Sequence, residues 1–147
     1  ACGRIACFAG VKALRAGMRS GGVAILSLGG GNMAASPLRD LAMEFSLEVI
    51  QACGAVAGHR SLVDQLERSA TSIGANLYEA QYAHSKADFI AKMQISLKEC
   101  YESEYWLELF RRANLLPEEQ AAGLFQRCGK LRRMLVASIN TAKRNQA

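Results

Sequence analysis

The sequence lacks the long apolar runs that mark membrane-spanning proteins. Its most apolar stretches, residues 5–11 and 23–28, are short and are interrupted or bounded by glycine. A membrane-spanning helix needs roughly 18 or more apolar residues in succession, so no span is predicted. Neither stretch has the layout of a secretory signal. We therefore expect a cytoplasmic protein that does not enter a membrane.

Cysteine and histidine are too sparse and too scattered to form a recognisable metal site. The cysteines are odd in number and form no C-x-x-C pair; they are Cys2, Cys7, Cys53, Cys100 and Cys128. They predict neither a disulfide framework nor a zinc site, and we expect reduced thiols that are buried or idle. Neither His59 nor His84 follows a glutamate by three residues, which is the spacing of metal centres in helical bundles. No metal and no cofactor are predicted.

Positive charge is concentrated at the two ends of the chain. Residues 1–36 carry four basic residues and no acidic one, whereas residues 37–147 carry 14 basic and 13 acidic residues. Within this nearly neutral part, residues 111–147 hold eight basic residues against only Glu118 and Glu119. We therefore expect one end of the folded domain to be cationic and suited to an acidic partner.

The first 35 residues differ in composition from the rest of the chain. Residues 1–36 hold eight of the 13 glycines and show no sustained helical or strand period. We predict a disordered glycine-rich extension over residues 1–35 and one domain over residues 36–147. The stretch 29–32 lacks the G-x-x-x-x-G-K-[ST] pattern of a phosphate-binding loop and is interpreted as a linker. A further hypothesis is that translation naturally starts at Met33, with residues 1–32 outside the native protein.

From Ser36 onward, capping residues and apolar spacing predict four amphipathic helices. Their expected ranges are about 37–57, 60–82, 86–113 and 117–143. Short connections require neighbouring helices to run antiparallel, so the predicted fold is an all-α, up-down four-helix bundle. The expected core positions are Leu38, Leu41, Ala42, Phe45, Val49, Ala52, Val56, Leu62, Leu66, Ile73, Leu77, Ala80, Leu124, Cys128, Leu131, Leu135, Ile139 and Ala142. Gly74 interrupts the second helix, and we expect a close helix crossing there.

The third predicted helix is apolar over more than one stripe. Ser85 and Asp88 have the spacing of a capping box at its start. Its apolar and aromatic positions are Phe89, Ile90, Met93, Leu97, Cys100, Tyr101, Trp106, Leu107 and Phe110. A helix of this breadth needs neighbours on two sides, which indicates self-association in addition to a bundle core. The expected anchors for a second copy or a partner helix are Tyr101, Tyr105, Trp106 and Phe110.

The acidic residues of the long helices do not form a recognisable catalytic motif. Glu79, Glu99, Glu102 and Glu104 could perform acid/base chemistry only if they converged on a cleft. We expect them instead to face solvent or to pair with Arg68, Lys92 or Lys98 within the bundle. A hydrolase is the least favoured hypothesis, and no catalytic residue is predicted.

The last helix carries the strongest candidate for a binding site. Arg127, Lys130, Arg132 and Arg133 follow one another within two turns, while Leu131 and Leu135 can face inward. With Lys143 and Arg144, they could contact phosphates and bind nucleic acid in a salt-sensitive, sequence-tolerant manner. An ordinary solvated helix face remains the alternative.

Several segments resemble the bacterial four-helix bundle proteins, also called 23S rRNA intervening-sequence proteins. The resemblance is carried by Arg68–Ala80, Ser85–Lys92, Ile95–Glu99 and Glu104–Leu109, and it extends weakly over residues 36–143. It implies a left-handed antiparallel bundle that assembles into a ring, commonly a homopentamer. A related branch, the accessory variability proteins of diversity-generating retroelements, binds nucleic acid and a reverse transcriptase. The near-neutral charge of residues 37–147 departs from the strongly basic barrel of that branch.

The leading functional prediction is a non-enzymatic, homo-oligomeric bacterial scaffold. It would bind RNA, DNA or a nucleoprotein partner such as a reverse transcriptase through its basic last helix. The alternative is a protein–protein interaction module that docks a partner helix without nucleic acid. The sequence leaves open the oligomer count, the partner and the biological process.

Overall fold

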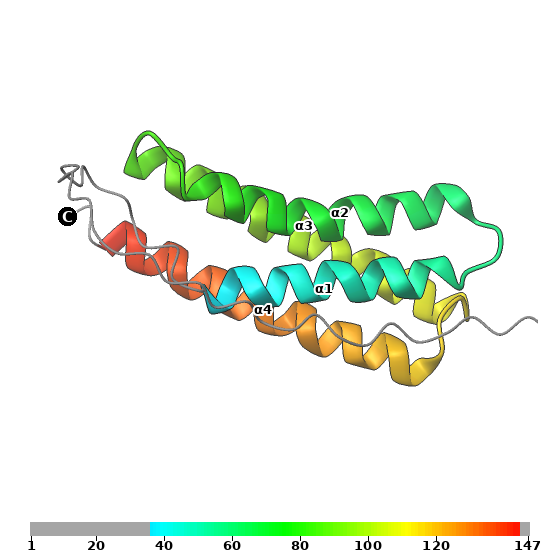
Figure 1. Cartoon of the computed structure of the whole chain (residues 1–147). Helices are drawn as coiled ribbons and strands as arrows, with labels where there is room; N and C mark the ends of the chain where they lie inside the picture. The colour runs from blue at the N-terminus through cyan, green and yellow to red at the C-terminus, as the bar shows by residue number, and fades with distance from the viewer. Residues whose placement is uncertain (1–35, 145–147) are drawn as a thin grey trace, which may run out of the picture. The chain divides into compact units, whose positions relative to one another are not determined.

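The computed structural model describes residues 36–144, which form four α-helices (Figure 1). The helices are α1 (Pro37–Gly54), α2 (Arg60–Ala80), α3 (Lys86–Arg112) and α4 (Glu118–Arg144). Contacts join α1 to α2, α2 to α3, α3 to α4 and α4 back to α1. The predicted all-α, antiparallel up-down bundle is confirmed. The extension predicted for residues 1–35 lies outside the described residues.

The first two helices end earlier than their apolar spacing predicts. The backbone N–H groups of Ala55 and Val56 donate to the carbonyls of Ala52 and Cys53, at 3.2 and 3.0 Å. Such three-residue steps tighten the last turn of a helix and close it. Gly58 therefore lies in the following turn, with a φ of 75°, and does not itself end α1. The helix α2 likewise stops at Ala80 and not at the predicted Tyr82.

The start of α3 has the hydrogen bonds that the sequence predicts. The Ser85 hydroxyl oxygen accepts the backbone N–H of Asp88 at 3.1 Å. The Asp88 carboxylate in turn accepts the backbone N–H of His84 at 3.1 Å. The first bond satisfies a backbone donor that the first helical turn leaves without a partner, and the second joins that turn to the residue before the N-cap. The capping box therefore fixes the register at which α3 begins.

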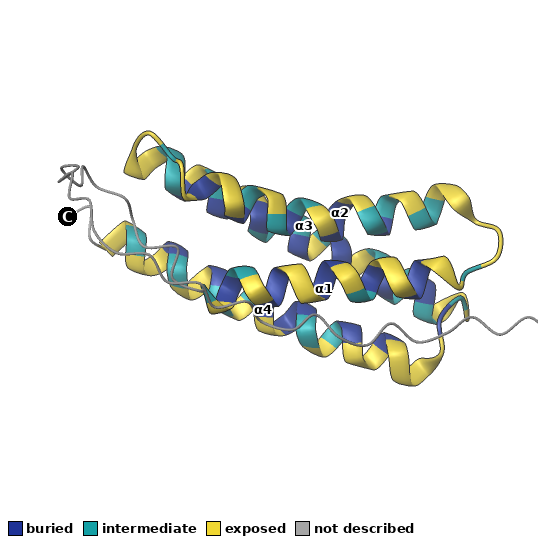
Figure 2. Ribbon diagram, viewed as in Figure 1, coloured by how far each residue is buried: buried dark blue, intermediate teal, exposed yellow. Residues whose placement is uncertain are grey.

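One hydrophobic core runs along the interior of the bundle (Figure 2). All four helices contribute to it, and Ile73 and Leu131 belong to the same cluster. Most predicted core positions are buried; Val56 and Leu62 are half-buried and pack against the cluster, and Ala142 is half-buried near the end of α4. Burying a leucine or phenylalanine side chain contributes about 1.5–3 kcal/mol, so this cluster is the main source of stability. None of the described helices is long and apolar enough to cross a membrane.

Buried serines join the helices at points that the sequence did not predict. Ser46 of α1 donates to the Ala70 carbonyl of α2 at 3.1 Å. Ser96 of α3 donates to the Ile73 carbonyl of α2 at 3.0 Å. Each serine satisfies its hydroxyl inside the core by bonding to a neighbouring helix, which favours one relative position of the two helices.

Gly74 lies where α1 and α2 approach each other. A methyl group at this position would lie 3.9 Å from the Ala42 Cβ and 4.0 Å from the Ser46 Oγ, which are ordinary contact distances. Gly74→Ala should therefore raise the free energy of unfolding by up to about 1 kcal/mol, because alanine is the better helix former. Chemical denaturation measures this change. A lower stability would show that the crossing cannot accept the methyl group.

Candidate functional site

The carboxylates that could have served a catalytic site take part in ion pairs between helices. Glu79 pairs with Lys92, and Glu102 pairs with Arg68 at 2.6 Å, as predicted for a structural role. Glu104 pairs with Arg132 of α4 at 2.9 Å. Glu99 differs, because its Oε2 atom is buried without a hydrogen-bond partner in the described part of the chain. Glu79, Glu102 and Glu104 therefore join neighbouring helices through separate ion pairs and do not converge on a shared cleft.

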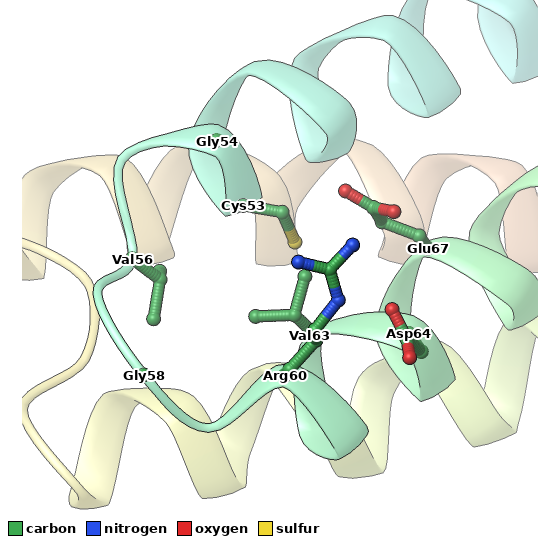
Figure 3. A pocket seen from close by; sticks show the side chains of 8 residues that line it. All are labelled: Cys53, Gly54, Val56, Gly58, Arg60, Val63, Asp64 and Glu67. Carbon is green, nitrogen blue, oxygen red and sulfur yellow. The ribbon is translucent and has the colours of Figure 1, made fainter.

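A pocket of about 380 Å³ lies beside the turn between α1 and α2 (Figure 3). The side chains of Cys53, Arg60 and Glu67 point into the same space. Burial, with a smaller contribution from Glu67, raises the pKa of the Cys53 thiol to about 12. Only the thiolate is an effective nucleophile, so Cys53 is inert near neutral pH. This pocket has polar walls but no activated group.

The other two described cysteines are also structural. The sulfur atoms of Cys100 on α3 and Cys128 on α4 lie 3.4 Å apart, and both residues are fully buried. The hydrogen bond with Cys100, followed by burial, raises the pKa of Cys128. The pair marks the level at which α3 and α4 pack together. Among residues 36–144, no three potential metal ligands come together.

Two of the predicted phosphate-binding residues pair with acids of the bundle. Arg127 bridges Glu44 and Glu48 of α1 at 3.0 and 2.7 Å. Arg132 contacts Glu104 of α3 and is only partly exposed. Both guanidinium groups are thus partly neutralised, and they hold α4 against its two neighbours. They are less suited to phosphate than their sequence positions indicate.

The remaining predicted cations are exposed and lie on or beside one side of α4. Positions at steps of three or four residues share this side, which we call the outer face of α4: Gln126, Lys130, Arg133, Ala137, Asn140 and Arg144. No carboxylate of residues 36–144 lies within ion-pair distance of Lys130, Arg133, Lys143 or Arg144. The helix has no acidic residue after Glu119. The outer face of α4 therefore carries a row of cations that no acidic residue among residues 36–144 neutralises.

The outer face adjoins an open depression between α1 and α4. The depression has a volume of about 340 Å³ and is lined by Leu41, Gly123, Gln126, Lys130, Arg133 and the ion-paired Arg127. A Cβ added at Gly123 would meet no atom within 4 Å, so the space beside this glycine is open. The two cations thus border a surface that an extended ligand could approach.

The predicted aromatic anchors separate into two groups. Tyr101 and Tyr105 are 51% and 61% exposed, and Trp106 is half-buried. Phe110 is fully buried in the core, so its assignment to a partner surface was wrong. The helical rotation of about 100° per residue turns position 110 inward even though the residue belongs to the same apolar series.

An exposed apolar stripe on α1 was missed by the sequence analysis. Met43, Leu47 and Ile50 follow one another at four and three residues and are all exposed. Such spacing places them along one side of the helix. The signal was present in the sequence, but the buried stripe of the same helix has a similar period and took precedence.

Comparison with known proteins places this bundle in a family. No match was found among curated proteins. Among solved structures, the chain is similar to a protein of unknown function from the S23 ribosomal protein family of Bacteroides thetaiotaomicron VPI-5482. The two share 35% identity with a TM-score of 0.66, over 69% of this chain and 97% of the other. The model of a family described as "23S rRNA-intervening sequence protein" matches residues 38–137. With its four-helix fold, the chain therefore belongs to the 23S rRNA-intervening sequence protein family.

Proposed function

We propose that this chain is a non-enzymatic helical scaffold that binds nucleic acid through the outer face of α4. The observation that carries the proposal is the row of exposed cations without carboxylate partners among residues 36–144, formed by Lys130, Arg133 and Arg144 with Lys143 beside them. At 1.5 Å per residue, the row from 130 to 144 extends about 21 Å. This length spans several phosphates of a nucleic acid strand.

The charge distribution favours binding of phosphates over binding of a single small anion. Cations spaced along a helix neutralise successive phosphates and release the counterions that accompany them. Arg127 and Arg132 pair with acids of α1 and α3, and the buried leucines of α4 pack into the core, so the row lies on a well-packed helix. The family description refers to a 23S rRNA intervening sequence, which makes RNA the first ligand to test.

Titration of a labelled, unstructured RNA at several salt concentrations tests the proposal. Contacts with three or four phosphates predict that the logarithm of the association constant falls with the logarithm of salt, with a slope of roughly −2 to −3 for a single strand. The slope should be similar for unrelated sequences and for DNA. Absence of binding even at low ionic strength would remove the proposal.

A second candidate function, association with a protein partner or with further copies of the chain, is favoured by the exposed stripe of Met43, Leu47 and Ile50. Adjacent exposed apolar residues on one helix are typical of a surface that another protein covers. Light scattering of the purified protein measures its oligomer count, for which five is the expectation from resemblance. Partners retained from cell extract after nuclease treatment would indicate protein contacts, whereas nuclease-sensitive partners would indicate a nucleoprotein.

A further inference from the structure

We propose that the nucleic acid bound by this protein is single-stranded and that Tyr101 and Tyr105 of α3 stack on its bases. The inference rests on the proposed function, because it states which residues contact the bases of the strand whose phosphates contact α4. It gives the two tyrosines a different role from the protein contact that the sequence predicts for them. The ligand class is an unpaired stretch of RNA or DNA.

The two tyrosines form a matched pair on the surface of α3. They lie four residues apart, so they occupy one side of the helix and are separated by about 6 Å along its axis. Their side chains are 51% and 61% exposed. Two open rings one turn apart can each accept a base, since every base has a π-face.

The tyrosine pair borders the cationic helix. The buried contact of Cys100 with Cys128 shows that α3 and α4 pack together at this level. The Arg132 guanidinium carbon lies 5.8 Å from the centroid of the Tyr101 ring, so a side chain of α4 reaches the aromatic pair directly. Arg133 follows Arg132 by one residue, about 100° round α4, and is exposed, whereas Lys130 lies further round, in the depression between α1 and α4. A strand that crosses α4 from Arg133 towards Arg132 therefore has the rings within reach of its bases.

Neighbouring contacts hold the rings in place before any ligand binds. Arg132, itself paired with Glu104 at 2.9 Å, lies over one side of the Tyr101 ring. Tyr105 meets Trp106 edge to face, with the ring centroids 5.0 Å apart. The Trp106 indole N–H donates to Glu102 at 3.3 Å, which fixes the indole in turn. Rings that are already ordered lose little conformational entropy when a base stacks on them.

The chemistry of stacking selects an unpaired strand. In a duplex each base is covered on both faces by its neighbours, so no face is free for a side chain. A protein partner could also cover two tyrosines, but it would have to supply acidic groups for the adjoining cationic row. A nucleic acid supplies one negative charge with every base.

The protein carries its own reporter for this test. Trp106 is the single tryptophan of the chain and contacts Tyr105. An unstructured RNA of about 12 nucleotides, a length within the range of single-strand sites, should change the fluorescence of Trp106 on binding. The same strand annealed to its complement should bind more weakly and leave the emission nearly unchanged.

Replacement of both rings should separate stacking from charge. Tyr101→Leu/Tyr105→Leu should weaken binding of the single strand by about tenfold per ring, or about 100-fold in total. Its salt slope should remain that of the wild type, because the phosphate contacts are intact. The matched control is Tyr78→Leu/Tyr82→Leu, which removes another pair of tyrosines four residues apart, 52% and 64% exposed, at the end of α2 and in the turn that follows it. The control should bind like the wild type.

Each outcome decides between the inference and the function on which it rests. If Lys130→Ala/Arg133→Ala weakened RNA binding and Tyr101→Leu/Tyr105→Leu left it unchanged, the stacking role would be overturned and nucleic-acid binding would be kept. No binding by the wild-type protein at low salt would overturn both. A change in oligomer mass in the tyrosine variant, with unchanged RNA affinity, would assign the rings to a protein interface and overturn the inference. Circular dichroism of each variant should show the helical content of the wild type.

Discussion

Phe110→Ala is expected to lower the free energy of unfolding by about 3–5 kcal/mol. Phe110 is among the largest fully buried side chains of the bundle, so truncation removes buried apolar surface and leaves a cavity. Domains of this size are stable by only about 5–15 kcal/mol in total, so the variant should unfold at a much lower denaturant concentration. Urea unfolding followed by circular dichroism measures the difference.

The control for this prediction lies on the same helix. Tyr105→Ala removes a ring that is 61% exposed and should cost less than about 1.5 kcal/mol. If Phe110→Ala instead kept its stability and lost self-association, Phe110 would face a partner, and its buried position in the bundle would be wrong.

Lys130→Ala/Arg133→Ala is expected to weaken RNA binding by roughly 100-fold at low salt. Hydrogen bonds to charged groups contribute about 1.5 kcal/mol or more each, and two lost contacts multiply their effects. Each lost contact should also make the slope of the salt dependence shallower by about 0.7 for a single strand. Fluorescence anisotropy of a labelled RNA measures both quantities.

Net charge alone must be separated from the position of the charge. Arg60→Ala/Lys86→Ala removes two exposed cations from α2 and α3 and gives the same net charge. This control should lose only a small part of the affinity. An equal loss in both double variants would show that RNA responds to overall charge, and the outer face of α4 would then have no special role.

The fold could be predicted from the sequence because local signals agreed along each helix. Pro37 at the first turn of α1, the Ser85–Asp88 box of α3 and the apolar spacing of α4 each specify a helix and its buried side. The end of α1 was placed too late, because an apolar period continues to Val56 while the backbone has already left the helix. The apolar period of a helix shows which of its sides is buried, but it does not show where the last backbone hydrogen bond of the helix lies.

The candidate site was only partly predictable. The basic residues of α4 are evident in the sequence, but their partners lie 28 and 83 residues away, at Glu104 and Glu44. Only packing of the helices brings those acids to Arg132 and Arg127, so no local pattern distinguishes a paired arginine from a free one. The exposed state of Tyr101 and the buried state of Phe110 likewise depend on helical rotation within the bundle.

Polar contacts inside the core were also beyond the sequence. Ser69 and Ser103, on α2 and α3, are fully buried and lie 3.0 Å apart between their hydroxyl oxygens. Serine is usually exposed, and its burial becomes favourable only when a neighbouring helix supplies a partner. Such pairs favour one position of the two helices relative to each other.

Photo-crosslinking of the protein to an RNA that contains 4-thiouridine tests the central claim most directly. After digestion, mass spectrometry identifies the peptides that carry nucleotide. Contact along the outer face of α4 and the neighbouring tyrosines predicts crosslinks within residues 98–105 and 126–144. Crosslinks confined to the outward sides of α1 and α2, with none on α4, would contradict the account.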